Sequence, residues 1–338
     1  MFTGRFGYGM ALVGCGSNLP TQIINNETLG QRVKTSDEWI RNRTGITYRR
    51  IAGSGETITT LGVSAAKAAL DHAGWDPTDV DLILLATSTP DDLFGSAPRL
   101  QGELGAHQAA AFDITAACSG FLFALITAAQ FIQTGSIRRA LIIGADQLSR
   151  WVNWDDRRTC ILFGDGAAAI AVEACPIEET GFLGFRMRSD GCRTDCLNLR
   201  QITKAIPLVR GITYQKGGFE PIAMNGQEVY KFAVREVPEI LHELLTSTNT
   251  ASSSIDWLLL HQANQRILEA VADRFAIPHD HILSNLANYG NTSAATIPLM
   301  LDEAVKDGRI QKGNLIASSG FGAGLSWGAA LLRWQGPK

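Results

Sequence analysis

Residues 112–132 read FDITAACSGFLFALITAAQFI, and this stretch decides what kind of fold the chain can adopt. A β-rich run ends near Thr115, and a long apolar segment with helical character follows from about residue 119. Because the segment is apolar on nearly every side, we expect a helix that is buried all round. Cys118 would then lie at the amino end of a central helix, where unpaired N–H groups and the helix dipole favour its thiolate form. The alternative is a small buried cysteine that fills a gap in the core.

On either side of this stretch, short β-rich runs alternate with longer helical stretches, which is typical of an α/β fold. Several of the β-rich runs are apolar throughout, as expected of strands that are covered on both faces. We expect strands at 81–88, 110–115, 139–146, 167–174, 256–262, 314–320 and 327–334, with a first strand in the opening MFTGRFGYGMALVGCGS. We expect helices at 60–74, 119–135, 228–248, 264–276 and 292–308.

The second half of this pattern resembles the first. The matched segments are DLILL at 81 with DWLLL at 256, ALIIGA at 140 with NLIASS at 314, ACSGFL around Cys118 with GNTSAA around Ser293, and GAAAI at 166 with GAALL at 328. The first three pairs lie at nearly the same offset and in the same order. They indicate two copies of one α/β unit, which we place at 1–178 and 179–338. A chance likeness between apolar strands is the alternative.

The composition narrows the class of function. In 338 residues, 45% hydrophobic and 19% charged residues indicate a globular chain with a large core. The formal net charge is −3 without a basic tract, so we expect no nucleic-acid partner. No apolar run is long enough to span a membrane and glycines interrupt the opening residues, so we expect a cytoplasmic protein. The six cysteines do not suggest a disulfide framework, and neither GCRTDC (191–196) nor PHDH (278–281) has the spacing of a metal site.

Two further segments carry polar side chains where α/β proteins place functional groups. His261 follows an apolar strand in DWLLLHQANQRI, and Asn291 stands between Gly290 and a helix in ANYGNTSAA. A satisfied core histidine and an ordinary helix cap are the alternatives. The glycine-rich SSGFGAGLSWG (318–328) is either a tight hairpin or a turn whose N–H groups form an oxyanion hole. Matching halves would bring Cys118, His261 and Asn291 into one cleft.

Six segments together carry a family resemblance that runs from about residue 10 to residue 334. They are TSDEWIRNRTGI (35–46), DITAACSGF (113–121), FGDGAAA (163–169), HQANQRI (261–267), GNTSAATIP (290–298) and GFGAGLSWG (320–328). In this order and spacing, the chain resembles the β-ketoacyl-acyl-carrier-protein synthase III family. The resemblance implies a thiolase fold, with two duplicated halves in five layers (α-β-α-β-α), a homodimer, and no metal or redox cofactor.

The activity that the resemblance implies is a decarboxylative Claisen condensation that initiates fatty-acid synthesis. Cys118 takes the acyl group of an acyl-CoA starter, expected to be acetyl-CoA, and malonyl-acyl-carrier protein then loses CO2. The enolate attacks the acyl-cysteine, which gives 3-oxoacyl-acyl-carrier protein, CoA and CO2. His261 and Asn291 match the pair that binds the malonyl thioester carbonyl. The N–H groups of Cys118 and Ala323 match the oxyanion hole.

The resemblance also implies substrate and partner contacts. Thr35, Trp39 and Arg157 match contacts to CoA, whose adenine lies between the tryptophan and the arginine. Phe94 in DDLFGSA matches an aromatic residue that crosses the dimer and shapes the acyl pocket. The positions matched to carrier-protein contacts are Arg43, Lys231, Gln262, Arg266 and Arg274. The alternative for each basic residue is an exposed side chain without such a role.

The chain departs from the family pattern at two places. Ala323 stands where many relatives have glycine, which keeps the N–H group but restricts the backbone. Asp273 and Arg274 stand where some relatives have two basic residues, which weakens the carrier-protein patch.

Rival functions of the same fold fit less well. Type III polyketide synthases have a proline in the glycine-rich loop, where this chain reads GFGAG. Elongating ketoacyl synthases use two histidines, and acyltransferases to alcohols or amines often lose the asparagine, whereas this chain has Asn291. Hydroxymethylglutaryl-CoA synthase uses a glutamate base, which this chain does not place near its cysteine motif. A non-catalytic acyl-CoA-binding protein would have a broken triad, and a Rossmann oxidoreductase would need a dinucleotide fingerprint. The length and branching of the starter acyl chain stay open.

Overall fold

The centre of the molecule is a pair of β-sheets. A computed structural model describes residues 7–337, so the part of the predicted first strand before Gly7 lies outside the described residues. The first sheet has the order β1-β7-β6-β4-β5 and the second β13-β14-β15-β8. Their bounds are Tyr8–Asn18 (β1), Leu82–Ala86 (β4), Ala110–Ile114 (β5), Arg139–Asp146 (β6), Gly166–Pro176 (β7), Phe182–Ser189 (β8), Trp257–Leu260 (β13), Leu315–Gly322 (β14) and Ser326–Arg333 (β15). Every predicted strand therefore forms, and β8 is an additional one.

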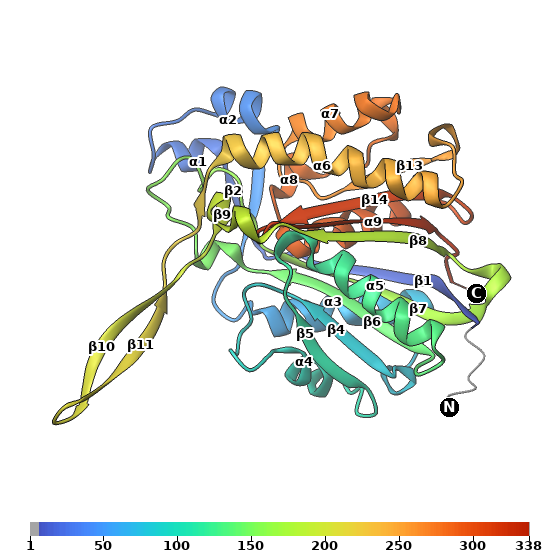
Figure 1. The fold of residues 1–338 in the computed structure, drawn as a ribbon, viewed down its shortest axis with the longest axis horizontal. Helices are drawn as coiled ribbons and strands as arrows, with labels where there is room; N and C mark the ends of the chain where they lie inside the picture. The colour runs from blue at the N-terminus through green and yellow to red at the C-terminus, as the bar shows by residue number, and fades with distance from the viewer. Residues whose placement is uncertain (1–6, 338) are drawn as a thin grey trace.

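Helices cover the outer faces of both sheets and fill the space between them, which gives the five predicted layers (Figure 1). The outer helices of the first sheet are α3 (Ile58–Ala73) and α4 (Ala97–Leu104). The central helices are α5 (Gly120–Gln133) and α9 (Thr296–Lys306), and the outer helices of the second sheet are α6 (Gly226–Ser247) and α7 (Gln265–Phe275). The α-β-α-β-α arrangement is confirmed.

Alternation along the strands explains why they are apolar throughout. In β4, Leu82 and Leu84 point into the central core with α5, whereas Ile83 and Leu85 point into the outer core with α3 and α4. Successive strand residues face opposite sides, so a sheet between two helical layers needs apolar residues on both. Helix α5 lies in the central core, as its uniformly apolar sequence predicts.

The two sheets repeat one pattern of directions. β7 pairs antiparallel with β1 and β6, and β15 pairs antiparallel with β8 and β14. β4 is parallel to β6, as β13 is to β14. In the first sheet, β5 pairs with the outer edge of β4. At the corresponding edge of the second sheet, an isolated parallel bridge joins Leu258 of β13 to Ile282.

Local geometry refines the residue offsets between the halves. The short 3-10 turns before α5 and α9, Ala117–Ser119 and Ser293–Ala295, begin at residues with φ of 48° and 52°. These turns correspond at an offset of 176, so Cys118 matches Ala294, and the predicted match to Ser293 was wrong by one residue. The division into halves at 178/179 stays a prediction. It falls in the 3-10 turn Ile177–Glu179 between β7 and β8.

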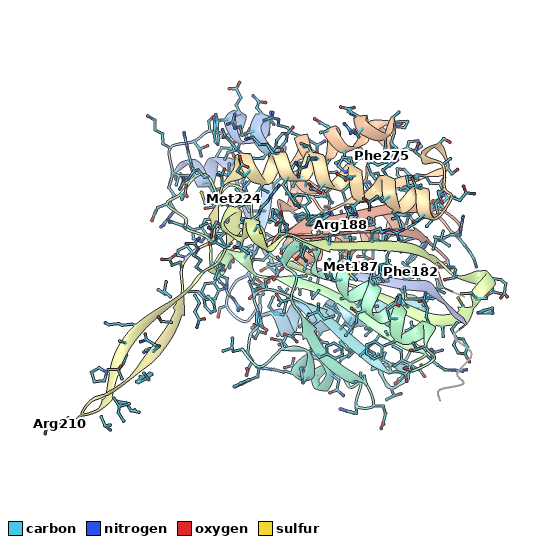
Figure 2. All side chains as sticks on the ribbon, viewed as in Figure 1. Phe182, Met187, Arg188, Arg210, Met224 and Phe275 are labelled. Carbon is cyan, nitrogen blue, oxygen red and sulfur yellow. The ribbon has the colours of Figure 1, made fainter. Side chains whose placement is uncertain are left out.

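A hairpin that the sequence pattern did not predict projects from the body. It consists of β10 (Gln201–Val209) and β11 (Ile212–Phe219), and Arg210 lies at its tip (Figures 1 and 2). At its root, Phe219 packs edge-on against Trp151 at 5.6 Å between ring centroids. The remaining short elements are β2 (Gln22–Asn25), β3 (Tyr48–Ile51), β9 (Leu197–Asn198), β12 (Ala223–Met224), α1 (Asn26–Gly30), α2 (Asp37–Thr44) and α8 (Leu286–Tyr289). Among residues 7–337, no helix has the length and apolar character that a membrane crossing requires.

Candidate active site

Cys118 lies where the two halves meet, in the 3-10 turn that leads into α5. The side chain is largely buried, with 7% of the residue exposed. Its sulfur accepts a hydrogen bond from the hydroxyl of Ser293 at 3.3 Å, and Ser293 belongs to the corresponding turn of the second half. The amino ends of α5 and α9 therefore approach each other at the thiol.

The glycine-rich turn between β14 and β15 packs against the backbone of Cys118. A Cβ atom on Gly322 would lie 2.6 Å from the backbone nitrogen of Cys118, so only glycine permits this approach. Ala323 follows in the turn and is half-buried. The two N–H groups predicted to form the oxyanion hole, those of Cys118 and Ala323, thus belong to segments in direct contact.

Asn291 is linked to the Cys118 thiol through Ser293, two residues further along the chain. Its side-chain carbonyl accepts the backbone N–H of Ser293 at 2.9 Å, and its backbone N–H donates to the carbonyl of Leu162 at 2.8 Å. Gly290 precedes it with φ of 66°, and a Cβ there would lie 2.6 Å from the oxygen of Leu162. Because the side-chain carbonyl is occupied, the amide NH2 is the group that remains to donate to a substrate.

His261 follows β13 and lies against the glycine-rich turn from the other side. Its backbone N–H donates to Ser319 of β14 at 2.8 Å. Its ring packs edge-on against Phe321 at 5.3 Å between centroids, one residue before Gly322. Within the described residues, its Nδ1 is buried and has no hydrogen-bond partner. The structure thus gathers Cys118 and the two predicted partner residues around the ends of β13, β14 and α5.

Burial controls the electrostatics of this site. It raises the pKa of the Cys118 thiol to about 12, with a smaller upward contribution from the carboxylate of Asp146 and a downward one from the Ser293 hydrogen bond. Burial alone lowers the pKa of His261 to about 3, so the imidazole is neutral near pH 7. A neutral imidazole donates a hydrogen bond from one nitrogen, which suits binding of a carbonyl oxygen.

The three residues matched to CoA contacts lie on the first half. The Arg157 guanidinium lies 5.0 Å from the centre of the Trp39 ring and donates to the carbonyl of Lys34 at 3.0 Å. For an adenine to stack between these two side chains, as the resemblance implies, the Arg157 guanidinium would have to move away from Trp39. The Thr35 hydroxyl is buried and has no hydrogen-bond partner among the described residues, so a ligand could bind it only after neighbouring groups move.

Three of the basic residues matched to carrier-protein contacts lie close together. The side chain of Asn264, at the start of α7, donates to the backbone carbonyl of Arg43 at 3.1 Å and so joins α2 to α7. The Arg266 guanidinium lies 5.4 Å from the ring centre of Tyr230, next to Lys231 in α6. Arg43, Arg266 and Lys231 are all exposed and come from three neighbouring helices.

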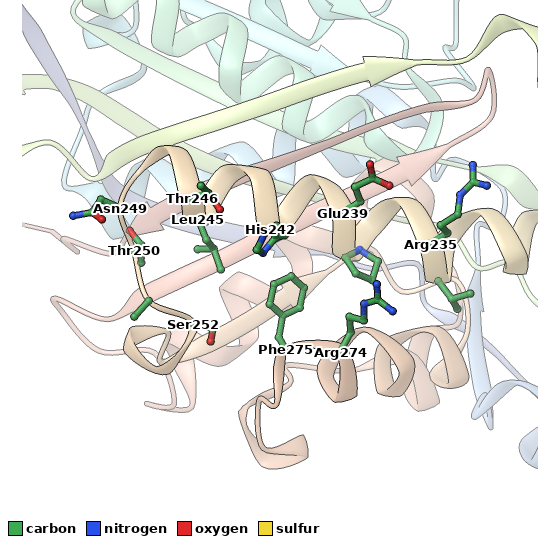
Figure 3. A pocket seen from close by; sticks show the side chains of 13 residues that line it. Arg235, Glu239, His242, Leu245, Thr246, Asn249, Thr250, Ser252, Arg274 and Phe275 are labelled. Atoms are coloured by element: carbon green, nitrogen blue, oxygen red, sulfur yellow. The ribbon is translucent and has the colours of Figure 1, made fainter.

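Arg274 lies apart from that group. It is eight residues beyond Arg266 along α7, about 12 Å at the rise of an α-helix. It lines a groove of about 1100 Å³ between α6 and α7, with Phe275 and His242 (Figure 3). The lining residues come from α6, the turn after it and the end of α7, so this groove is separate from Cys118.

The role predicted for Gln262 does not fit its position, and we correct it. The residue is 0% exposed, so its side chain cannot touch a docked protein. Its side-chain carbonyl instead accepts the hydroxyl of Ser284 at 3.0 Å and the N–H of Asn285 at 2.9 Å. Gln262 therefore holds the segment before α8 beside His261.

Phe94, which was predicted to shape the acyl pocket across a dimer, is not packed against its own chain. In this single chain, 99% of its surface is exposed.

Comparison with known proteins decides the family. A beta-ketoacyl-[acyl-carrier-protein] synthase III of Prochlorococcus marinus (strain MIT 9313) is 71% identical over 335 residues, 99% of both chains. The corresponding protein of Synechococcus sp. (strain RCC307) is 67% identical over 329 residues, 97% of this chain and 99% of that one. The chain belongs to the 3-oxoacyl-[acyl-carrier-protein] synthase III family. The family descriptions for the synthase III and its C-terminal region match residues 112–191 and 245–334, which contain the segments around Cys118 and around His261 and Asn291.

Solved structures of synthase III enzymes confirm the thiolase fold. The 3-oxoacyl-[acyl-carrier-protein] synthase III of Aquifex aeolicus VF5 matches with a TM-score of 0.88 and 42% identity, over 96% of this chain and 100% of that one. The priming beta-ketosynthase of the R1128 polyketide pathway matches with a TM-score of 0.89 and 31% identity, over 98% of both chains. The predicted synthase III family and thiolase fold are therefore confirmed.

Two polar residues at this site were not given a functional role from the sequence. Ser293 reads as part of an ordinary helix start, and Asp146 as the polar end of the apolar strand β6. The position of Asp146 is the same signal that drew attention to His261, a titratable side chain at the end of a buried strand. The contact of Ser293 with the sulfur is visible only when the two halves are packed together.

Proposed function

We propose that the chain joins an acyl group from acyl-CoA to malonyl-acyl-carrier protein with loss of CO2, and so initiates fatty-acid synthesis. The observation that carries the proposal is the meeting of both halves at one thiol. The Asn291 segment reaches the sulfur of Cys118 through Ser293, and His261 lies against Phe321 of the glycine-rich turn. This arrangement supplies a nucleophile and two donors for a thioester carbonyl.

In the first half-reaction, the Cys118 thiolate attacks the thioester carbonyl of the starter, for which we propose acetyl-CoA. The bond between the carbonyl carbon and the CoA sulfur breaks, and an acyl-Cys118 intermediate remains. The N–H groups of Cys118 and Ala323 are proposed to stabilise the tetrahedral oxyanion. The approach of Gly322 to the Cys118 nitrogen supports this assignment, because it holds the turn against the start of α5.

In the second half-reaction, His261 and Asn291 are proposed to hold the malonyl thioester oxygen. As CO2 leaves, negative charge develops on that oxygen, and two preorganised donors stabilise it. The neutral state of His261 and the occupied side-chain carbonyl of Asn291 both favour donation towards the substrate. The enolate carbon then attacks the acyl-Cys118 carbonyl, and the cysteine leaves as a thiolate.

The wider contacts are part of the same proposal. Thr35, Trp39 and Arg157 would hold CoA, and the unpartnered hydroxyl of Thr35 supports its share in this. Arg43, Lys231, Arg266 and Arg274 would receive the acidic carrier protein by charge complementarity. We further propose a cytoplasmic homodimer in which Phe94 enters the acyl pocket of the partner subunit.

Intact-protein mass spectrometry with acetyl-CoA alone tests the proposal. We expect one acetyl group on Cys118, its absence in Cys118→Ala, and its discharge into a 3-oxoacyl product when malonyl-acyl-carrier protein is added. Acylation by a longer acyl-CoA but not by acetyl-CoA would keep the chemistry and change the starter. A folded protein that no acyl-CoA modifies would refute the proposed function.

A further inference from the structure

Ser293 lies between the nucleophilic sulfur and a buried carboxylate. Its hydroxyl donates to the sulfur of Cys118 at 3.3 Å, and the carboxylate of Asp146 accepts the N–H of the next residue, Ala294, at 3.2 Å. Asp146 is also close enough for a Ser293 hydrogen bond to lower the pKa of its carboxyl. The backbone N–H of Ser293 is bound to the Asn291 side chain, so the residue is fixed and its hydroxyl proton is the mobile part. The hydroxyl has one proton and two lone pairs, so it cannot donate to Cys118 and Asp146 at once. When it turns from the sulfur to Asp146, its oxygen becomes the acceptor for the proton of the Cys118 thiol.

Asp146, the last residue of β6, is fully buried and forms no ion pair with lysine or arginine among residues 7–337. Four donors besides Ser293 hold its carboxylate in place. They are the N–H of Ser88 at 2.7 Å, the hydroxyls of Thr87 at 3.2 Å and Thr89 at 3.0 Å, and the N–H of Ala294 at 3.2 Å. Burial outweighs these bonds and raises the pKa of this acid. A carboxylate in this state can take up a proton.

The first half-reaction needs a destination for the Cys118 proton. His261 is a poor one, because burial holds its pKa at about 3 and its Nδ1 has no carboxylate partner to support a charge. Transfer to Asp146 is different, because the buried pair keeps one negative charge in total. A thiol with a carboxylate becomes a thiolate with a carboxylic acid, and no second charge is created in the low-dielectric interior.

We propose that Ser293 and Asp146 form a proton relay that generates the Cys118 thiolate. The Cys118 proton moves to the Ser293 oxygen while the Ser293 proton moves to the Asp146 carboxylate. The thiolate then attacks acyl-CoA, and CoA leaves with the electron pair of the broken carbon–sulfur bond and is protonated by water. When the enolate later expels Cys118 as a thiolate, the Asp146 proton returns through Ser293. Ser293 touches the reacting atom, whereas Asp146 acts through it as a positioning residue.

This relay rests on the proposed function and is tested in the first half-reaction alone. In Ser293→Gly, which tolerates the left-handed backbone of this position, we expect acetylation of Cys118 by acetyl-CoA to slow by about 100-fold at pH 7. Thr292→Val is the matched control, because the hydroxyl it removes is also buried but pairs with Thr296. Its acetylation rate should stay within about threefold of the native enzyme.

The pH dependence separates a relay from a structural role. The titratable groups that face Cys118 are Asp146 and, behind Phe321, His261. With the relay, the thiolate forms without proton loss to solvent, so acetylation of the native enzyme should vary little between pH 6.5 and 8.5. In Asp146→Asn, the proton must leave to solvent, and the rate should rise about tenfold per pH unit. The Asp146→Asn rate at pH 7 should be far below the native rate.

The second half-reaction shows whether a variant still has a correctly folded active site. Decarboxylation of malonyl-acyl-carrier protein needs His261 and Asn291 but not the thiolate, so we measure it in a Cys118→Ala background. Adding Ser293→Gly to Cys118→Ala should leave decarboxylation within about threefold. Equal losses of acetylation and decarboxylation would assign Ser293 a structural role and overturn the relay. Normal acetylation in Ser293→Gly with a flat pH profile would overturn it as well.

A measurement on the native enzyme needs no variant. Two protons move together in the relay, so the single-turnover acetylation rate should fall in D2O and depend on the deuterium fraction along a curve. A linear dependence, or no isotope effect, would contradict it. A native enzyme that no acyl-CoA acylates would remove the proposed function, whereas acylation that is unaffected by the loss of Ser293 or Asp146 would remove only the relay.

Discussion

Arg157 and Arg158 are adjacent arginines with different surroundings, and this contrast tests the CoA site at the scale of single residues. Arg157 lies over Trp39, whereas Arg158 is held by the carboxylate of Asp156 at 2.8 to 3.1 Å. We expect Arg157→Ala to raise the KM for acetyl-CoA by about tenfold, in keeping with about 1.4 kcal/mol of cation–π and stacking energy.

Arg158→Ala should leave that KM unchanged. The acetyl thioester of N-acetylcysteamine, which has no adenine, should react equally well with both variants. Steady-state kinetics with the two thioesters measures this difference, and equal effects of the two substitutions on acetyl-CoA would contradict the assignment of Arg157.

His261 links the active site to the acid stability of the fold. Its folded pKa is about 3, against about 6.5 when unfolded, so between these values the unfolded chain binds the extra proton. The stability from this residue is therefore complete above pH 6.5 and is lost as the pH falls towards 3, by up to about 1.4 kcal/mol per pH unit.

His261→Gln should remove that share of the acid sensitivity. We expect the gap in unfolding midpoint between pH 7 and pH 5 to be smaller in the variant than in the native protein, as followed by denaturant titration at each pH. The same gap in both proteins would show that burial of His261 costs less than its folded pKa implies.

At the scale of elements, the turn between β14 and β15 depends on the missing side chain of Gly322. A methyl group there would come within 2.6 Å of the Cys118 nitrogen and push the turn away from α5. We expect Gly322→Ala to slow acetylation of Cys118 at least tenfold in single-turnover mass spectrometry. Gly102→Ala is the control, because no atom lies within 4 Å of a Cβ at that position in α4. An unimpaired Gly322→Ala would argue against the oxyanion hole at this turn.

Most elements that pack into an apolar cluster could be predicted from the sequence, whereas the exposed hairpin of β10 and β11 could not. Helix α5 and strands β4, β6 and β14 are apolar because both of their faces are covered. β10 and β11 have no such covering, and β10 contains Pro207, which favours an edge strand or none. In the same hairpin, Lys204 lies directly opposite Lys216, a pairing that weakens a strand signal.

The candidate site was predictable in part for the same reason. Cys118 and His261 stand at the ends of apolar elements, so their surroundings follow from the pattern. The buried position of Gln262 does not, because it depends on hydrogen bonds to Ser284 and Asn285 that only the folded chain brings together. The predicted match of Ser293 to Cys118 was wrong by one residue because it compared residue types alone. The two turns instead correspond through the left-handed residues that begin them, Ala117 and Ser293.

At the scale of the whole molecule, the exposed loop around Phe94 predicts association of two chains. A fully exposed phenylalanine beside an exposed Leu93 costs solvation energy, and burial of the ring would recover about 2 kcal/mol. We expect the native protein to sediment as a dimer and Phe94→Asp to weaken dimerisation at least tenfold. Ile177→Asp, at another exposed apolar residue, should not. A monomeric native protein would contradict the proposed homodimer.

The projecting hairpin makes the molecule vulnerable at one place. Lys204, Arg210 and Lys216 are exposed on an arm whose residues belong to none of the four apolar clusters of the described chain. Brief digestion with trypsin should therefore nick the arm first and give two fragments divided near residue 210. Because the sheets and central helices lie outside the arm, the fragments should stay together and keep their acetylation of Cys118. The two fragments would then behave as a bimolecular enzyme, in which one fragment can be exchanged for a labelled copy.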